Sequence, residues 1–209
     1  MKNWLLTGGV GCGKTSVGRI LAAQTVGSIA SFSADHEVSS LLTESEVIDR
    51  ITEKFGDDVL AYSDGNRCLD KHLLRQRVFI DPGLRSELEA ILHPRVLARL
   101  ESQRAEMDAS GTELFLAEVP LHYEIGETVT ADLVIVVAAS RAMQVRRLME
   151  RRGLEEPIIE QILRSQWPIE AKVEKADVVI WNDGDEAALE AQVLTLLRQH
   201  WHDTNHRNP

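Results

Sequence analysis

One stretch near the N-terminus, Gly8-Gly9-Val10-Gly11-Cys12-Gly13-Lys14-Thr15, constrains the fold of this chain more than any other. It matches G-x-x-x-x-G-K-[ST], the pattern of a glycine-rich loop that binds nucleotide phosphates. The apolar residues 4–6 precede it as an expected buried strand, and Val17, Ile20 and Leu21 follow it at helical spacing. This order of strand, loop and helix favours a phosphate-binding loop over a plain glycine-rich turn.

The residue types of the loop indicate how it would bind a nucleoside triphosphate. Successive backbone N–H groups and the positive end of the following helix attract phosphate oxygens. Lys14 would reach the β- and γ-phosphates, and the Thr15 hydroxyl would ligate Mg²⁺. The residues expected to contact the nucleotide here are Gly9, Val10, Gly11, Cys12, Gly13, Lys14 and Thr15.

Composition narrows the class of protein. The 209 residues, 44 % of them hydrophobic, suit one compact domain with insertions. The net charge of −10 argues against a general nucleic-acid or anionic-membrane binder. One of the two cysteines, Cys12, lies inside the loop, and the other is Cys68. This placement argues against a structural disulfide and favours a reducing cytoplasm. No secretory signal or membrane span is expected, and the pattern leaves the oligomeric state open.

Apolar segments divide the chain into a sheet and an insertion. Strands are expected at residues 4–6, 28–32, 114–119, 132–137 and 178–181. Residues 36–110 show helical periodicity without a strand, with a capping box at residues 43–46, a turn at 64–66 and a helix break at His93-Pro94. Two later helices are expected, one over 155–167 that Pro168 ends and one over 185–200, followed by a disordered tail at 202–209.

Two acids and a run of arginines are further candidates. Asp35 follows the second strand, where it could be a catalytic carboxylate or equally a helix N-cap. Glu118 ends the third strand, where it could hold a magnesium-bound water or be an ordinary surface acid. The five arginines suit a phosphate-facing lid better than a solvated helix, because arginine forms forked contacts with phosphate oxygens. They are Arg141, Arg146, Arg147, Arg151 and Arg152.

With these pieces in order, the chain resembles the dephospho-coenzyme A kinase family of P-loop kinases from the phosphate loop to Gly184. The signatures that carry the resemblance are residues 7–14, Ala34-Asp35, Phe55-Gly56, Asp64-Gly65, residues 74–79, His93-Pro94, residues 119–121 through Glu124, Gln166, and Ala176-Asp177 through Asn182-Asp183-Gly184. The resemblance implies an α/β P-loop kinase fold: a five-stranded parallel sheet, a helical substrate-binding insertion and a small helical lid. The expected core is 1–35, 111–140 and 176–201, with the insertion at 36–110 and the lid at 141–175.

The resemblance also implies a reaction, in which ATP phosphorylates the ribose 3′-hydroxyl of dephospho-CoA and gives ADP and coenzyme A. Asp35 would be the general base, and Arg147 and Arg151 would neutralise charge on the phosphoryl oxygens beside Lys14. The segment 182–184 would receive the adenine, with Asn182 and Gly184 as the contacting residues. The expected dephospho-CoA contacts are Asp35, Leu74, Arg77, His93 and Glu124.

Three positions depart from the family pattern. Ser33 replaces the first Asp of Asp-Ala-Asp, Lys71 replaces an Arg, and His122 replaces a Leu. These changes leave Lys14 and Asp35 intact, but they keep open a P-loop kinase for another small hydroxyl-bearing metabolite. A nucleotide-hydrolysing switch is a further alternative, although the chain lacks an Asn-Lys-x-Asp guanine-reading motif.

Overall fold

The computed structural model describes residues 1–25, 29–63, 65–126 and 129–201. They belong to two compact units. The first unit consists of Met1–Phe32 and Met107–Pro209, and the second of Ser33–Glu106. The predicted disordered tail at 202–209, Ser28 of the predicted second strand and Asp64 of the predicted turn lie outside the described residues.

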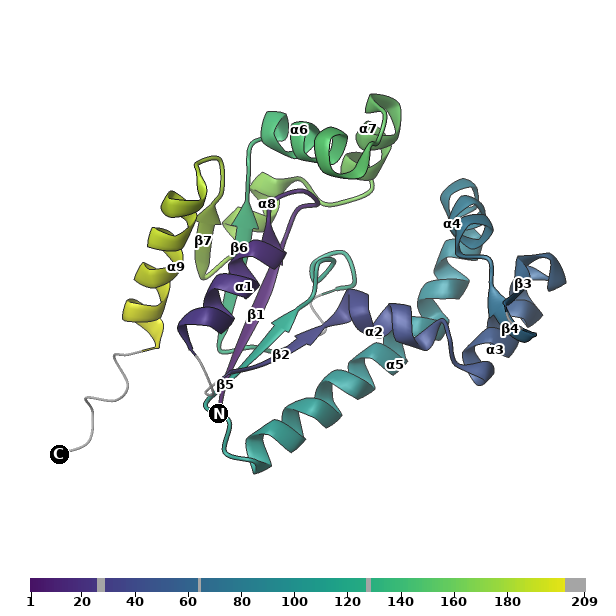
Figure 1. Ribbon diagram of the computed structural model, residues 1–209, viewed down its shortest axis with the longest axis horizontal. Helices are drawn as coiled ribbons and strands as arrows, with labels where there is room; N and C mark the ends of the chain where they lie inside the picture. The colour runs from purple at the N-terminus through teal and green to yellow at the C-terminus, as the bar shows by residue number, and fades with distance from the viewer. Residues whose placement is uncertain (26–28, 64, 127–128, 202–209) are drawn as a thin grey trace. The chain divides into compact units, whose positions relative to one another are not determined.

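A five-stranded parallel sheet forms the centre of the first unit, with strand order β2-β5-β1-β6-β7 (Figure 1). Its strands are β1 (Lys2–Gly8), β2 (Ile29–Ser33), β5 (Leu114–Glu118), β6 (Leu133–Ala138) and β7 (Val178–Trp181). Its helices are α1 (Lys14–Gln24), α6 (Arg141–Arg152), α7 (Glu156–Arg164), α8 (Ile169–Glu174) and α9 (Glu186–His200). The sheet confirms the predicted fold class, and strands lie at all five predicted positions.

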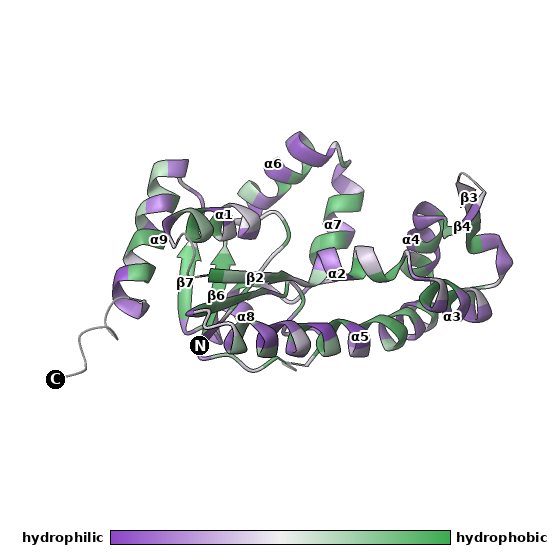
Figure 2. Ribbon diagram, turned by 60° about the horizontal axis from the view of Figure 1, so that its bottom comes forward, coloured by the Kyte–Doolittle hydropathy of each residue, from purple (hydrophilic) through white to green (hydrophobic). Residues whose placement is uncertain are grey.

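Both faces of this sheet are covered, which explains the near-continuous apolar runs of its strands. On one face, Leu6 and Val137 pack with Val17 of α1 and Val193 of α9. On the other face, Val136 and Ala138 of β6 pack against α8. The hydropathy colouring shows β6 hydrophobic along its length (Figure 2). None of the described helices is long and apolar enough to cross a bilayer.

The loops that follow the strands gather at one edge of the sheet. β1 pairs in parallel with β5 and β6, and β6 with β7. Because the strands run the same way, their carboxyl ends meet, and ligands of open α/β sheets bind at that edge. The phosphate loop, residues 119–126, the start of α6 and residues 182–184 all follow these ends.

The second unit is helical with one hairpin. Its elements are α2 (Ala34–Leu41), α3 (Ser45–Phe55), the 3₁₀ turn η1 (Asp57–Val59), β3 (Leu60–Ser63), β4 (Asn66–Leu69), α4 (Lys71–Ile80) and α5 (Pro82–Ala109), the last residues of which belong to the first unit. The expectation of no strand between residues 36 and 110 is wrong, because β3 and β4 pair antiparallel from Leu60 with Leu69 to Ser63 with Asn66. Four-residue strands are too short to give a clear alternating pattern.

The predicted helix break at His93-Pro94 is wrong, since α5 runs through Pro94. Buried Ile91 and Val96 pack the helix on both sides of the proline, and Arg95 donates from its side chain to the Ile91 carbonyl over 2.8 Å. A proline removes only one backbone hydrogen bond, and this packing compensates for its loss.

Two further helix boundaries differ from prediction. The capping box at 43–46 is wrong, because Glu44 is the N-cap of α3 without a side-chain cap bond, and the Thr43 hydroxyl donates instead to Ser40. The helix expected over 155–167 already ends at Arg164, and Pro168 then begins the unpredicted α8 rather than ending a helix.

Candidate functional site

The phosphate loop has a backbone that two of its glycines make possible. Gly8 has φ +138° and Gly13 has φ +98°, in the region that side chains disfavour. A Cβ on Gly8 would lie 2.1 Å from the Val137 carbonyl oxygen, and one on Gly13 would lie 2.3 Å from Asn182 Nδ2. At position 8 the backbone lies too close to β6, and at position 13 too close to Asn182, for any residue other than glycine.

Lys14 and Thr15 open α1 directly after the loop. Lys14 Nζ donates to the carbonyls of Gly8 at 3.2 Å and Gly9 at 3.0 Å, so its side chain lies back across the loop. Thr15 is exposed in the first turn of α1, at the positive end of the helix dipole. Both residues therefore lie where the sequence pattern predicts contacts with the phosphates and their metal ion.

The carbonyls of the loop have their own donors. Arg147 of α6 donates from Nη1 to Gly11 at 3.2 Å and Cys12 at 3.4 Å, and from Nη2 to the Asn182 carbonyl at 2.9 Å. Asn182 Nδ2 donates to the Cys12 carbonyl at 2.8 Å. If the N–H groups of the loop face a phosphate, its carbonyls need other partners, and these two side chains supply them.

Charges and burial shift two pKa values here. Burial, followed by the neighbouring Arg151, lowers the pKa of Arg147, although a guanidinium keeps its charge at neutral pH. Burial raises the pKa of Cys12, only partly opposed by Lys14, so this fully buried thiol stays protonated. Cys12 thus fills space beneath the loop as a small apolar group.

Two glutamines complete the loop, and sequence reasoning assigned neither of them a role. Gln166 Oε1 accepts the N–H of Val10 at 3.0 Å. Gln144 is buried and donates from Nε2 to the Ala139 carbonyl at 3.0 Å, and a Cβ on Gly9 would lie 2.9 Å from its Oε1. Gln166 was noted only as a family signature, and neither glutamine has a local sequence pattern that reveals its contact.

Glu124 lies in the segment after β5, within a buried group of residues. Its Oε1 forms an ion pair with Lys172 at 2.7 Å and accepts the N–H of Trp167 at 2.9 Å. Lys172 is fully buried. Glu124 Oε2 is also buried and has no hydrogen-bond partner within the part of the chain that the structure describes. The neighbouring His122, one of the departures, packs edge-on against Tyr123.

The arginines of α6 differ in their surroundings. Arg147 is bound to the loop, whereas Arg151 is exposed and makes no hydrogen bond or ion pair with the described residues. Arg141 pairs with Glu160 and so joins α6 to α7. The start of α6 is fixed by Asp183, which accepts the Ser140 N–H at 2.8 Å. Although burial alone would raise the pKa of Asp183, the hydrogen bonds from Ser140 lower it.

In the second unit, Asp35 is the second residue of α2 and is exposed. The alternative that Asp35 caps this helix is wrong, because Ser33 is the N-cap and accepts the His36 N–H at 3.4 Å. The serine that departs from the family pattern therefore begins the helix. The Asp35 carboxylate makes no hydrogen bond or ion pair with the described residues, which leaves it available to a ligand.

An ion-pair network holds the helix that carries Asp35. Arg99 of α5 pairs with Glu37 of α2 at 3.0 Å and also with Glu44, the N-cap of α3. The hydrogen bond with Glu44, and after it the hydrogen bond with Glu37, raise the pKa of Arg99. Arg99 thus ties α2 and α3 to the long helix α5.

The other predicted contacts have mixed surroundings. Leu74 is buried, and His93 is half-buried. Arg77 donates to the Phe55 carbonyl and pairs with Asp58, so it links α4 to the end of α3. Glu118, at the end of β5, is half-buried and lies opposite Leu6.

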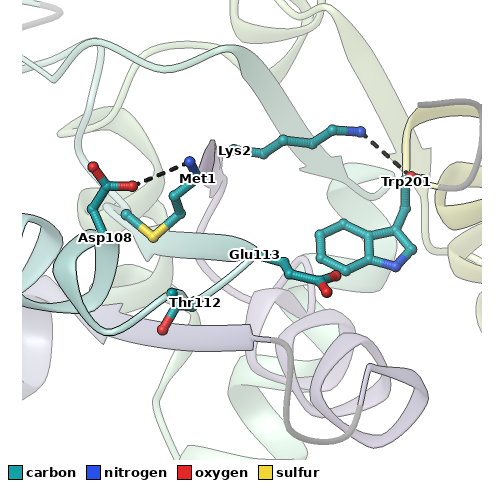
Figure 3. A pocket seen from close by; sticks show the side chains of 7 residues that line it. Met1, Lys2, Asp108, Thr112, Glu113 and Trp201 are labelled. Atoms are coloured by element: carbon teal, nitrogen blue, oxygen red, sulfur yellow. Dashed lines mark hydrogen bonds and ion pairs between the residues drawn. The ribbon is translucent and has the colours of Figure 1, made fainter. Parts of the chain in front are cut away.

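A cavity of about 590 Å³ is lined by residues from both ends of the chain, among them Met1 and Trp201 (Figure 3). Its lining includes Met1 and Lys2 at the amino end of β1 and Glu113 just before β5. The Met1 ammonium pairs with Asp108 at 3.1 Å across it. Since the phosphate loop follows the carboxyl end of β1, this cavity is not part of the candidate site.

The phosphate loop follows a strand, precedes a helix that begins with Lys-Thr, and is held by Arg147. This arrangement defines a P-loop phosphotransferase. The family model described as dephospho-CoA kinase matches residues 5–188. The chain belongs to the dephospho-CoA kinase family.

Individual relatives agree with this assignment. The chain is 36 % identical over 196 residues to the dephospho-CoA kinase of Methylococcus capsulatus, covering 93 % of this chain and 94 % of that one. It is also 36 % identical to that of Anaeromyxobacter dehalogenans over 193 residues, 92 % and 89 % of the two chains. Among solved structures, the dephospho-CoA kinase from Campylobacter jejuni has a TM-score of 0.62 at 26 % identity, with 95 % and 96 % of the chains covered. Shikimate kinase from Acinetobacter baumannii, with a TM-score of 0.52 at 20 % identity over 100 % and 96 % of the chains, shares the fold alone.

Proposed function

We propose that this protein transfers the γ-phosphoryl group of ATP to the ribose 3′-hydroxyl of dephospho-CoA, giving coenzyme A and ADP. The observation that carries the proposal is the complete phosphate loop, with Lys14 and Thr15 in place, inside a chain that matches the dephospho-CoA kinase model over residues 5–188. Family membership favours this reaction over another acceptor or a hydrolytic switch.

On the donor side, Lys14 and the N–H groups of residues 9–15 would bind the β- and γ-phosphates, except for the Val10 N–H, which donates to Gln166. Mg²⁺ fits this site, because it needs few protein ligands when phosphates and water complete its coordination, and the exposed Thr15 hydroxyl can supply one. No cluster of three or more acidic, histidine or cysteine ligands occurs in the described residues, which suits a metal that arrives with ATP. When bound, Mg²⁺ would neutralise phosphate charge.

On the acceptor side, Asp35 would accept the proton of the ribose hydroxyl as it attacks phosphorus in line. Support comes from its exposed carboxylate, which neither caps α2 nor pairs with a described side chain. Leu74, Arg77, His93 and Glu124 would contact dephospho-CoA. For Glu124, the support is the Oε2 atom, which has no partner among the described residues. The Arg77 guanidinium would contact the ligand while it also binds the Phe55 carbonyl and Asp58.

The two arginines would share the stabilisation of charge on the transferred phosphoryl group. Arg151 has a free guanidinium to offer, whereas Arg147 would act at short range through the loop that it holds. Asn182 and Gly184 would border the adenine, and residues 141–175 would form the lid. The buried position of Cys12 inside the loop argues against a structural disulfide and so supports a cytoplasmic location as part of the same proposal.

The role of Asp35 is tested by Asp35→Asn, assayed for ADP formation with ATP and dephospho-CoA. We expect kcat to fall on the order of 100-fold or more while ADP binds as before, because the base is lost but the phosphate loop is intact. Asp57→Asn, a second exposed acid of the same unit, is the control and should keep its rate. Near-normal turnover of Asp35→Asn would rule Asp35 out as the base.

A further inference from the structure

We propose that Gln166 is a positioning residue for the phosphate loop, and that Trp167, Glu124 and Lys172 hold Gln166 in place. The proposal rests on the nucleotide-binding role of the loop given above. It assigns to the linker between α7 and α8 the task of fixing the first half of that loop.

Gln166 contacts the loop through a single hydrogen bond to the backbone of its first half. Gln166 Oε1 accepts the Val10 N–H at 3.0 Å, from a position 156 residues away in sequence. The carbonyls of Gly11 and Cys12, in the second half of the loop, are bound by Arg147 and Asn182. Arg147 and Asn182 therefore hold carbonyls of the second half of the loop, and Gln166 holds an N–H group of the first half.

The type of residue also suits this place. The Val10 N–H needs an acceptor, and a carboxamide oxygen provides one without charge. A carboxylate beside bound phosphates would repel them, whereas an aliphatic side chain would leave the partly buried N–H unpaired. A glutamine accepts the Val10 hydrogen bond and adds no negative charge beside the bound phosphates.

The next residue anchors the linker on its other side. The Trp167 N–H donates to Glu124 Oε1 at 2.9 Å, and the same oxygen pairs with fully buried Lys172 at 2.7 Å. Separating the two partners of a buried ion pair leaves an uncompensated charge, so the pair resists displacement of the linker.

The Trp167 ring strengthens the anchor. It stacks on Tyr123 with ring centroids 5.8 Å apart and planes inclined by 18°. Lys175 Nζ lies 5.8 Å from the centroid of Trp167 and 5.9 Å from that of Tyr123, within the range of a cation–π contact. Two adjacent residues thus join the loop after β1 to the segment after β5, next to the end of α7 at Arg164.

The test compares Gln166→Met with Gln161→Met. Methionine keeps the length of the side chain but removes the strong acceptor, and Gln161 is an exposed glutamine of α7 without a described side-chain partner. ADP binding is measured by calorimetry, thermal unfolding without nucleotide by fluorescence, and KM for each substrate by ADP release.

We expect Gln166→Met to bind ADP about 3- to 10-fold more weakly and to raise KM for ATP, with KM for dephospho-CoA and Tm little changed. Gln161→Met should match the unsubstituted protein.

Two more variants separate positioning from simple folding. Gln166→Glu keeps an acceptor oxygen but adds a negative charge, so its loss of ADP affinity should shrink as the ionic strength rises, whereas that of Gln166→Met should not. Trp167→Ala, which does not touch the loop, should weaken ADP binding in the same direction, and Trp167→Phe should restore it. Equal ADP affinity of Gln166→Met and the unsubstituted protein, or a loss of Tm alone, would overturn the inference. If the unsubstituted protein bound no ADP, the nucleotide assignment itself would fall, and the inference with it.

Discussion

The side-chain amide of Asn182 donates to the Cys12 carbonyl over 2.8 Å and lies 2.3 Å from the place of a Cβ on Gly13. One contact thus links the loop after β7 to the phosphate loop and also excludes every residue but glycine at position 13. The predicted adenine-side residue Asn182 therefore also shapes the site for the phosphates.

This relationship predicts that Gly13→Ala loses nucleotide binding, because the new methyl group must displace Asn182 and distort the loop. We expect kcat to fall on the order of 100-fold, with ADP binding weakened in calorimetry. Gly111→Ala is the matched control, since Gly111 also has a positive φ of 82° but nothing within 4 Å of its Cβ position. It should cost about 1 kcal/mol of stability and leave ADP affinity unchanged. Equal ADP affinity of both variants would contradict the packing argument.

The two arginines of α6 predict different kinetic defects. Arg147→Ala removes donors from Gly11 and Cys12, so ADP should bind roughly tenfold more weakly even before any reaction. Arg151→Ala leaves the loop intact, so ADP should bind normally while kcat falls on the order of 100-fold. Calorimetry with ADP and steady-state kinetics give the two quantities, and the same pattern in both variants would refute this division of roles.

The cysteines predict one slow and one fast thiol. Burial raises the pKa of Cys12, so at pH 8 its reactive thiolate is scarce and the sulfur is inaccessible. Cys68 is partly exposed. Titration of the native protein with a thiol-specific chromogenic reagent should give one rapid equivalent, and a second only on unfolding. Cys68→Ser should abolish the rapid phase; its persistence would show that Cys12 is accessible.

The network around Arg99 predicts a coupled effect in the second unit. Arg99→Ala removes the pairs with Glu37 and Glu44 and should lower the free energy of unfolding by about 1 kcal/mol. Because Glu37 and Asp35 share α2, kcat should also fall a few-fold while KM for ATP stays constant. Arg50→Ala, which removes an exposed pair with Glu46 on a single helix, is the control. Unchanged kcat in Arg99→Ala would show that this network does not orient Asp35.

The centre of the sheet could be predicted because its strands are apolar runs covered on both faces, as residues 133–138 illustrate. The phosphate loop could be predicted because its chemistry fixes residue types at fixed spacing. The short hairpin and the helix through Pro94 could not, since long-range packing decides them. The contacts of Gln166 and Gln144 also escaped prediction, because a carboxamide can meet any backbone group and its partner is chosen only by the fold.

The most direct test of the central claim is ADP release by the purified protein with ATP and Mg²⁺, measured with and without dephospho-CoA. The account predicts that dephospho-CoA raises the rate far above background hydrolysis and that one coenzyme A, phosphorylated at the ribose 3′-position, forms for each ADP. A rate that does not change when dephospho-CoA is added would contradict it.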